Sequence, residues 1–308
     1  MGGGGTSPGK RAPRAWAVTA MKVVSLLSLT RVYNIALIAA AQYLSCMFFF
    51  TFHAPDFSVL TDPHFFVLVV CTWMVVAGGY IINFFYDKNK DLVNYPEKGF
   101  IDGYISQSTT LKIYLTLNFA AVALSMLVSL RSVVFFSGFA FLLWFYSHKL
   151  KKIPLVSNFA MAALAMIPLF AVFFYRKVVD INVLISHGMF LFFLLSALSM
   201  LNDLNNRRGD AVFGYRTLPV VLGERKASVV TAAVLAAAAA CTVTVLAFEK
   251  GNAYFFYFLF TGIALLAAAV ALLARPSDKV CSVIYTGVKV MILIGLLCIP
   301  LRIVPLDC

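Results

Sequence analysis

The sequence is poor in charged residues, and acidic residues are the scarcest of them. Only 12% of its 308 residues are charged, 62% are hydrophobic, and Asp and Glu together number 13. A soluble globular domain is about a quarter charged and about half apolar, because its surface must be polar. This shortage argues against a soluble globular protein and predicts that much of the chain is exposed to lipid.

The sequence also lacks the patterns of several other classes of protein. Its six cysteines form no C-x-x-C pair and no disulfide framework, and Cys308 does not complete a C-a-a-X prenylation signal. No Ser-His-Asp arrangement, phosphate-binding glycine loop or D-G-x-x-A-R run of CDP-alcohol phosphotransferases is present. The net charge of +12 does not predict nucleic-acid binding, because the basic residues lie in short gaps between apolar runs.

Long apolar runs follow one another along most of the chain. A helix needs about 20 apolar residues to cross the hydrocarbon layer, so we expect an all-α, polytopic membrane protein with about nine transmembrane helices. The expected spans are 27–52, 64–86, 110–130, 132–148, 154–175, 181–203, 227–248, 253–274 and 282–304. Residues 1–22 are predicted to be a disordered basic tail, and residues 23–308 to form the transmembrane domain.

The gaps between these spans differ in charge. With nine spans, the gaps rich in Lys and Arg all fall on the side of the basic N-terminus. The opposite side keeps only Arg131, Arg176, Lys177, Lys250 and Arg302. Because basic residues are enriched in cytoplasmic loops, we expect an integral protein of the cytoplasmic (inner) membrane. Its N-terminus and active-site loops are then expected on the cytoplasmic side.

A first polar cluster ends the second expected span. Asn83, Asp87 and Asp91 follow one another at four-residue spacing, which places them on one face of a helix. Their oxygen atoms suit Mg²⁺, which binds through a few carboxylates and the phosphates of a substrate. Taken alone, the cluster equally fits a solvated helix end that forms salt bridges with neighbouring lysines.

A second cluster ends the sixth expected span, on the same side of the membrane. Asp203 and Asp210 are seven residues apart, again on one face of a helix. Two such helix ends facing each other can hold Mg²⁺ ions around a diphosphate, so that the metals neutralise the leaving group. Basic loop residues such as Arg208 and Lys98 would add to that stabilisation. The apolar helices would enclose a polyprenyl tail. These features predict ionisation of an allylic diphosphate and transfer of the prenyl group to an acceptor.

The two clusters resemble the paired motifs of the UbiA superfamily of intramembrane prenyltransferases. That family carries N-D-x-x-D-x-x-x-D after its second helix and D-x-x-D-x-x-G-D after its sixth. The corresponding stretches here read NFFYDKNKD from Asn83 to Asp91 and DLNNRRGD from Asp203 to Asp210. The following run from Gly214 to Gly223, GYRTLPVVLG, is similar to the family's G-x-x-T-L-P-V-x-L-G. The resemblance covers residues 25–304 and implies a nine-helix bundle.

The resemblance also implies roles for individual residues. Asn83, Asp87, Asp91, Asp203 and Asp210 match the family's Mg²⁺ ligands, and the four aspartates are expected to be essential for catalysis. Lys149 matches a basic loop position that is expected to contact the diphosphate. Tyr146, one turn earlier, either lines the same pocket or is an interface aromatic.

Three positions depart from the family pattern. Phe84 stands where the family usually has Asp, Asn206 replaces the middle acid of the second motif, and Glu97-Lys98-Gly99 follows Pro96 where the family often has R-P. An Asn side chain still offers an oxygen ligand, whereas Phe84 offers none. We expect an active enzyme, because all four remaining aspartates are in place.

The acceptor is the least determined feature. Short stretches, among them residues 37–44 and 78–83, look most similar to bacterial geranylgeranylglycerol-phosphate geranylgeranyltransferase-like members, which implies a glycerol-phosphate-type lipid acceptor. Arg31 and Asn34, at the start of the first span, either meet the acceptor's anionic group or anchor the helix. An aromatic acid or quinone precursor as acceptor, and a degenerate scaffold or transporter, remain alternatives.

Overall fold

The computed structural model describes residues 24–49, 54–94, 106–176 and 180–306, and for residues 88–94 it describes the backbone alone. The predicted tail, residues 1–22, lies outside the described part. The elements are α2 (Val32–Leu44), η1 (Ser45–Phe49), η2 (Phe57–Leu60), α3 (Pro63–Asn94), α5 (Gln107–Ser125), α6 (Leu130–His148), η3 (Leu150–Lys152), α7 (Val156–Arg176), α8 (Ile181–Val212), α9 (Leu218–Leu222), α10 (Glu224–Phe248), α11 (Tyr254–Ala274), α12 (Asp278–Cys298) and η4 (Ile299–Ile303). No strand occurs in the described residues, which confirms the all-α prediction.

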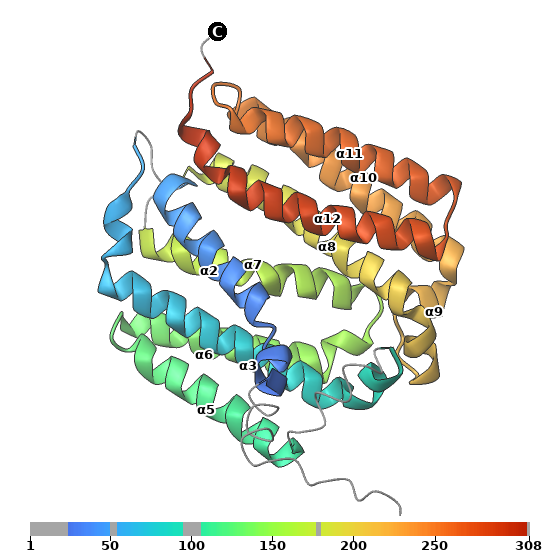
Figure 1. Cartoon of the computed structure of the whole chain (residues 1–308), viewed down its shortest axis with the longest axis horizontal. Helices are drawn as coiled ribbons and strands as arrows, with labels where there is room; N and C mark the ends of the chain where they lie inside the picture. The colour runs from blue at the N-terminus through green and yellow to red at the C-terminus, as the bar shows by residue number, and fades with distance from the viewer. Residues whose placement is uncertain (1–23, 50–53, 95–105, 177–179, 307–308) are drawn as a thin grey trace, which may run out of the picture.

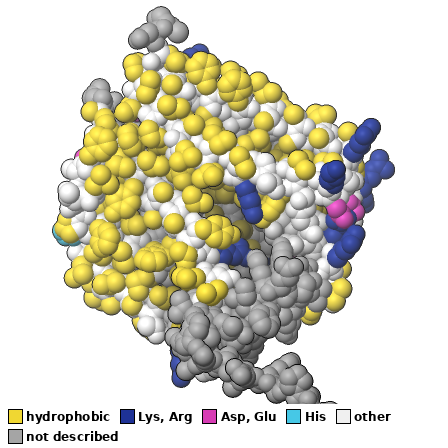
Figure 2. Space-filling view, viewed as in Figure 1, with side chains coloured by type: hydrophobic (Ala, Val, Ile, Leu, Met, Phe, Trp, Pro, Cys, Tyr) yellow, Lys and Arg dark blue, Asp and Glu magenta, His cyan; other side chains and the backbone are white. Residues whose placement is uncertain are grey.

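The helices match the predicted spans closely. Eight helices in the described part of the chain are long and apolar enough to cross a membrane, judged by length and composition. The third predicted span, 110–130, corresponds to α5, which is not among the eight and ends at Ser125. Hydrophobic side chains cover much of the face in Figure 2, while Lys and Arg gather at one edge. This distribution fits a bundle whose sides face lipid.

Polar residues determine where several of the helices begin. The side chain of Ser106 accepts a hydrogen bond from the backbone of Thr109, and Ser129 does the same for Ser132. Asp180 caps α8 and Ser277 caps α12 in the same manner. These caps satisfy backbone groups that the first turn of a helix leaves unpaired.

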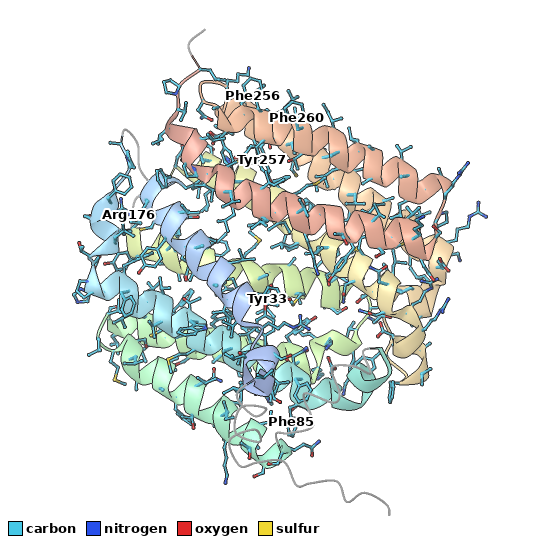
Figure 3. All side chains as sticks on the ribbon, in the orientation of Figure 1. Tyr33, Phe85, Arg176, Phe256, Tyr257 and Phe260 are labelled. Atoms are coloured by element: carbon cyan, nitrogen blue, oxygen red, sulfur yellow. The ribbon has the colours of Figure 1, made fainter. Side chains whose placement is uncertain are left out.

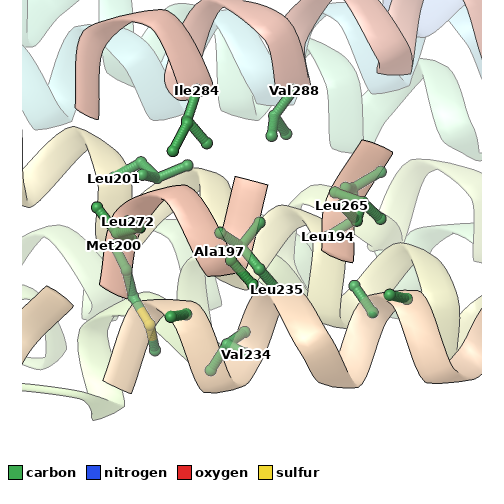
Figure 4. Close-up of a cluster of buried hydrophobic side chains, with 14 of the residues drawn as sticks. Leu194, Ala197, Met200, Leu201, Val234, Leu235, Leu265, Leu272, Ile284 and Val288 are labelled. Carbon is green, nitrogen blue, oxygen red and sulfur yellow. The ribbon is translucent and has the colours of Figure 1, made fainter. Parts of the chain in front are cut away.

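The bundle has two halves, each with its own apolar core (Figure 1). One core joins η1 and helices α3, α5, α6 and α7. The other joins α8, α10, α11 and α12 through side chains such as Leu201, Leu235 and Leu265 (Figure 4). The halves meet where α7 and α3 pack against α8. The two acidic motifs therefore lie in different halves, the first on α3 and the second on α8.

Two adjacent glycines allow α3 to approach both of its neighbours in the first half. A Cβ atom on Gly78 would lie 2.6 Å from the side chain of Asn118 on α5, and one on Gly79 would lie 2.9 Å from Leu143 on α6. Both distances are shorter than a normal van der Waals contact. A larger residue at either position would therefore displace the end of the Asn118 or Leu143 side chain.

We call the end of the bundle where α3, α6 and α8 finish the motif end. The opposite end holds two groups of ionisable side chains. Arg176, labelled in Figure 3, forms an ion pair with Asp56, at 2.6 Å between Nη1 and Oδ2. Glu249 is fully buried, with Oε1 3.1 Å from both Arg302 Nε and His187 Nε2. Arg302 also donates to the Phe49 carbonyl, so this group joins η4 to η1 and to both halves.

The buried Glu249 group makes stability depend on pH. Burial by itself raises the pKa of Glu249, but its pairing with His187 and the charge of Arg302 hold that pKa below its ordinary value. A lowered pKa in the folded state means that stabilisation is complete above the ordinary pKa of about 4.3 and is lost as pH falls through the folded value.

We expect Glu249→Gln to lower the free energy of unfolding by about 3 kcal/mol at pH 7, because the partly buried Arg302 loses its countercharge. Below pH 4.3, the free energy of unfolding of the variant should also decline less steeply with falling pH than that of the wild type. Thermal unfolding in detergent between pH 3 and 7 measures both effects, and Asp56 accounts for some of the slope that remains. An unchanged slope in the variant would mean that Glu249 is not the titrating group.

Candidate functional site

The carboxylate of Asp87 is the centre of the candidate site. It is 4% exposed and lies one helical turn beyond Asn83 on the same face of α3. Lys151 Nζ donates to Asn83 Oδ1 at 2.8 Å and to Asp87 Oδ2. The Tyr215 hydroxyl donates to the other oxygen, Asp87 Oδ1, at 2.8 Å. Asp87 thus receives donors from two segments distant in sequence, which balances the cost of burying its charge.

The two donors come from the connections that follow α6 and α8. Lys151 lies in η3, the short turn between α6 and α7. Tyr215 follows Gly214, whose φ of +67° is easily adopted by glycine and turns the chain after α8. The Tyr215 backbone then donates to the Asp210 carbonyl at 2.9 Å. This turn brings Tyr215, which follows the second motif, back to Asp87 of the first motif.

The second motif lies on α8 and faces the same lysine. Asp203 Oδ2 accepts a hydrogen bond of 2.8 Å from Asn158 Nδ2 on α7, which also donates to Ser199 at 3.1 Å. Asp210, two turns further along α8, is fully buried. The carboxylates of both Asp203 and Asp210 lie within electrostatic range of the Lys151 ammonium. Lys151 therefore contacts the first motif and lies within electrostatic range of the second.

Arg31 and Asn34 both contact Tyr80 of α3, close to the first motif. The Arg31 guanidinium lies 5.4 Å from the centre of the Tyr80 ring, and Asn34 Nδ2 donates to the Tyr80 hydroxyl at 3.2 Å. Arg31 is exposed, has a left-handed backbone with φ of 48°, and lies within electrostatic range of Lys151. The start of α2 is thereby held next to the first motif.

The structure places the other predicted site residues in different surroundings. Tyr146 on α6 lies within electrostatic range of Asp203, whereas Lys149 is exposed at the end of the same helix. Arg208 is exposed and its Nη2 lies 3.4 Å from Asp278 Oδ2 on α12. Asn206 is half-buried on α8. The backbone of Asp91 continues α3 one turn beyond Asp87, but the structure does not describe the Asp91 side chain. Lys98 lies outside the described residues.

Three residues that contact the aspartates of the candidate site were not predicted from the sequence: Lys151, Asn158 and Tyr215. Lys151 stands only two residues after Lys149 in the same basic gap, so spacing alone does not separate them. Asn158 is a polar residue near the start of an apolar span, and such residues often serve function. Tyr215 lies within the run from Gly214 to Gly223 that resembles the family, although that pattern does not specify a tyrosine there.

The side chains gathered at the motif end include both oxygen atoms that can bind cations and cationic donors. No three His, Cys, Asp or Glu side chains among the described residues meet as a metal site by themselves. Instead, an amide oxygen and a carboxylate from α3 already converge on one cation, the Lys151 ammonium. Two further carboxylates approach it from α8. Such oxygen atoms suit a hard cation, and lysine, arginine and tyrosine donors suit phosphate oxygens.

The contact between Lys151 and Asp87 should contribute to stability, because both side chains are largely removed from solvent. We expect Lys151→Met to cost about 3 kcal/mol by leaving Asp87 without its countercharge. Adding Asp87→Asn to Lys151→Met should restore part of the loss. Thermal unfolding in detergent with EDTA measures the interaction energy between Lys151 and Asp87. Lys149→Met, at an exposed position, is the matched control. Equal losses for the two lysine variants would contradict the pairing.

Solved structures share the arrangement of helices. A digeranylgeranylglyceryl phosphate synthase studied for its biosynthetic role in membranes superimposes with a TM-score of 0.68 at 20% identity, over 92% of this chain and 99% of that one. A UbiA homologue from Archaeoglobus fulgidus bound to GPP and Mg²⁺ gives 0.62 at 14% identity, over 90% and 99%. At these identities the likeness concerns the fold.

Sequence relatives extend the comparison. The digeranylgeranylglyceryl phosphate synthase of Thermococcus gammatolerans is 30% identical over 69% of this chain and 74% of its own length. The enzyme of the same name from Sulfolobus acidocaldarius is 28% identical over 70% and 75%. The model of the UbiA prenyltransferase family matches residues 43–293, which include both acidic motifs. This integral membrane protein belongs to the UbiA prenyltransferase family.

Proposed function

We propose that the protein transfers an isoprenyl group from a prenyl diphosphate to the hydroxyl group of a glycerol-phosphate lipid. The observation that carries the proposal is that Asp87 of the first motif binds Tyr215, whose backbone donates to Asp210 of the second motif, and Lys151, which lies within electrostatic range of Asp203 and Asp210. In the transfer, the bond between the allylic carbon and the diphosphate oxygen breaks, and the diphosphate leaves with the electron pair. The acceptor oxygen bonds to that carbon and its hydroxyl proton is released.

Mg²⁺ fits the residues at the motif end. Asn83 Oδ1 and the Asp87 carboxylate already bind one cationic group together, and Asp203 and Asp210 are positioned to supply a second pair of carboxylates. Asp91, one turn further along α3, is a further proposed ligand. When bound there, Mg²⁺ neutralises the negative charge of the diphosphate leaving group. Phe84, which departs from the family pattern, is half-buried and adds no ligand.

The basic and hydroxyl side chains of the site are proposed to bind the diphosphate. Lys151 has three donors, two of which contact Asn83 and Asp87 in this structure. The Tyr215 hydroxyl and the exposed Arg31 are further donors on the same side. The predicted contacts of Tyr146, Asn34, Asn206, Lys98, Lys149 and Arg208 with substrate remain predictions. Tyr146 lies within electrostatic range of Asp203, and Asn34 donates to Tyr80 of α3.

We further propose that the motif end faces the cytoplasm and that the membrane is the cytoplasmic one. The connections and adjoining helix ends on this side carry Lys149, Lys151, Lys152, Arg207, Arg208, Arg216, Arg225 and Lys226. Basic residues in short loops favour the cytoplasmic side. The same side supplies charged, water-soluble Mg²⁺ to the site, and the prenyl chain extends from it among apolar helices.

The names of the relatives favour a lipid acceptor over an aromatic one. Both curated relatives described above are named for digeranylgeranylglyceryl phosphate synthesis, which implies a glyceryl phosphate product in those proteins. The chain covers about three quarters of their lengths. The same class of acceptor is therefore the one to test first in this protein.

The test supplies purified protein with geranylgeranyl diphosphate, Mg²⁺ and either geranylgeranylglycerol phosphate or a panel of aromatic acids, and identifies the products by mass spectrometry. We expect an ether lipid and loss of turnover with EDTA. A prenylated aromatic product would move the acceptor to quinone or pigment precursors. No consumption of diphosphate under any condition would contradict a prenyltransferase activity.

Single substitutions test the site itself. Asp87→Asn and Asp210→Asn should each lower turnover roughly 100-fold, because a buried charge that stabilises the leaving group is removed. Lys151→Met should lower turnover far more than Lys149→Met. Asp180→Asn is the matched control, since Asp180 caps α8 at the opposite end and Asn caps helices equally well. Wild-type turnover in the Asp87 or Asp210 variant would refute the site assignment.

A further inference from the structure

Lys289 is a charged residue in the middle of an apolar spanning helix. It lies eleven residues after Asp278, where α12 begins, and nine before Cys298, where it ends. Its neighbours from Val288 to Gly295 are otherwise apolar, and the Lys289 side chain is exposed. A lysine far from both helix ends is costly in a membrane and is commonly retained for function.

The contacts of Lys289 do not neutralise its charge. Among the described residues, no carboxylate lies within 4.0 Å of its ammonium, and its contact is with the ring of Tyr285, 4.0 Å from Nζ to the ring centre. Tyr285 is one turn closer to the motif end, so the lysine side chain extends toward that end. The cation–π contact orients the ammonium without supplying an anion.

The depth of the ammonium follows from the packing of α12 against α8. Tyr285 is seven residues from Asp278, or about 10 Å along the helix axis. Asp278 forms an ion pair with Arg207, four residues after Asp203 on antiparallel α8. The Lys289 ammonium is therefore roughly one helical turn deeper in the bundle than Asp203, on the membrane side of the proposed diphosphate site.

The face that carries α12 has an opening bordered by hydrophobic side chains (Figure 2). The segments η1 and η4, which continue α2 and α12, are joined at the opposite end, where Arg302 donates to Phe49, and the two helices diverge toward the motif end (Figure 1). Figure 2 shows a hollow between them, with Lys or Arg side chains in and beside it and hydrophobic side chains around it. Tyr33, labelled in Figure 3 at the start of α2, is 65% exposed on the other side of this gap.

We propose that Lys289 is a positioning residue that binds the phosphate group of the acceptor lipid as it enters through this opening. The proposal rests on the proposed function and specifies its acceptor as a phosphate monoester. The apolar surroundings strengthen an ion pair between the lysine and a phosphate. The lipid chain remains among the apolar side chains, and its glycerol hydroxyl is held next to the motif end. A neutral acceptor gains nothing from this charge.

Steady-state kinetics with the full chain separate this role from a structural one. We expect Lys289→Gln to raise the KM for geranylgeranylglycerol phosphate about tenfold or more, with the KM for geranylgeranyl diphosphate unchanged. Lys289→Arg should restore most of the acceptor affinity. Lys279→Gln, an exposed lysine in the first turn of the same helix, is the matched control and should behave as wild type. Equal changes in both KM values, or none, would overturn the proposal.

A binding measurement tests the same residue without turnover. Native mass spectrometry should show that the wild-type protein prefers lysophosphatidic acid, a phosphate monoester, over a monoacylglycerol of the same chain length. Lys289→Gln should lose this preference, and Lys279→Gln should keep it. A preference that persists in Lys289→Gln would overturn the proposal. A preference that depends on Lys289, with no prenylation of any phosphate lipid by the wild type, would refute the proposed function while leaving the binding role in place.

Discussion

The structure of the motif end depends on the buried carboxylate of Asp87. An ionised group with 4% exposure is stable only if donors surround it. Here the donors are Lys151, from the connection between α6 and α7, and Tyr215, from the connection after α8. Satisfying this one charge therefore requires three segments to meet, and their meeting brings both acidic motifs to one place.

The remainder of the fold supports this meeting. Each half of the bundle has its own apolar core, and neither core by itself contains both motifs. The halves pack through α3, α7 and α8, where Asn158 binds Asp203. At the opposite end, Glu249, His187 and Arg302 join η4 to η1 across the halves. Helices α2 and α12 are thus fixed at one end and separate toward the other.

Charge is scarce in this chain, and its placement is informative for that reason. Most of the buried or half-buried ionisable groups described above have an oppositely charged neighbour, because an unpaired charge in a low-dielectric region is costly. Lys289 differs, since its contact is an aromatic ring. Lys289 is also exposed, and these two observations are the basis of the proposed contact with the phosphate of a lipid substrate.

The sequence by itself determined the all-α fold, nearly all of the spans and the faces on which the aspartates lie. These features are local: span length follows from hydrophobic thickness, and residues four apart on a helix share a face whatever surrounds them. The caps at Ser106, Ser129, Asp180 and Ser277 are local in the same sense. The family assignment followed from two motifs that are each contained in a single helix.

Only the tertiary structure decided which side chains meet those aspartates. Lys149 and Lys151 are equivalent by composition and spacing, yet the short turn η3 leaves the first exposed and directs the second to Asp87. Arg208 belongs to the second motif by sequence but points to Asp278 on α12. Tyr215 reaches Asp87 because Gly214 turns the chain. Contacts between helices depend on packing and loop geometry, which the periodicity of a single helix does not contain.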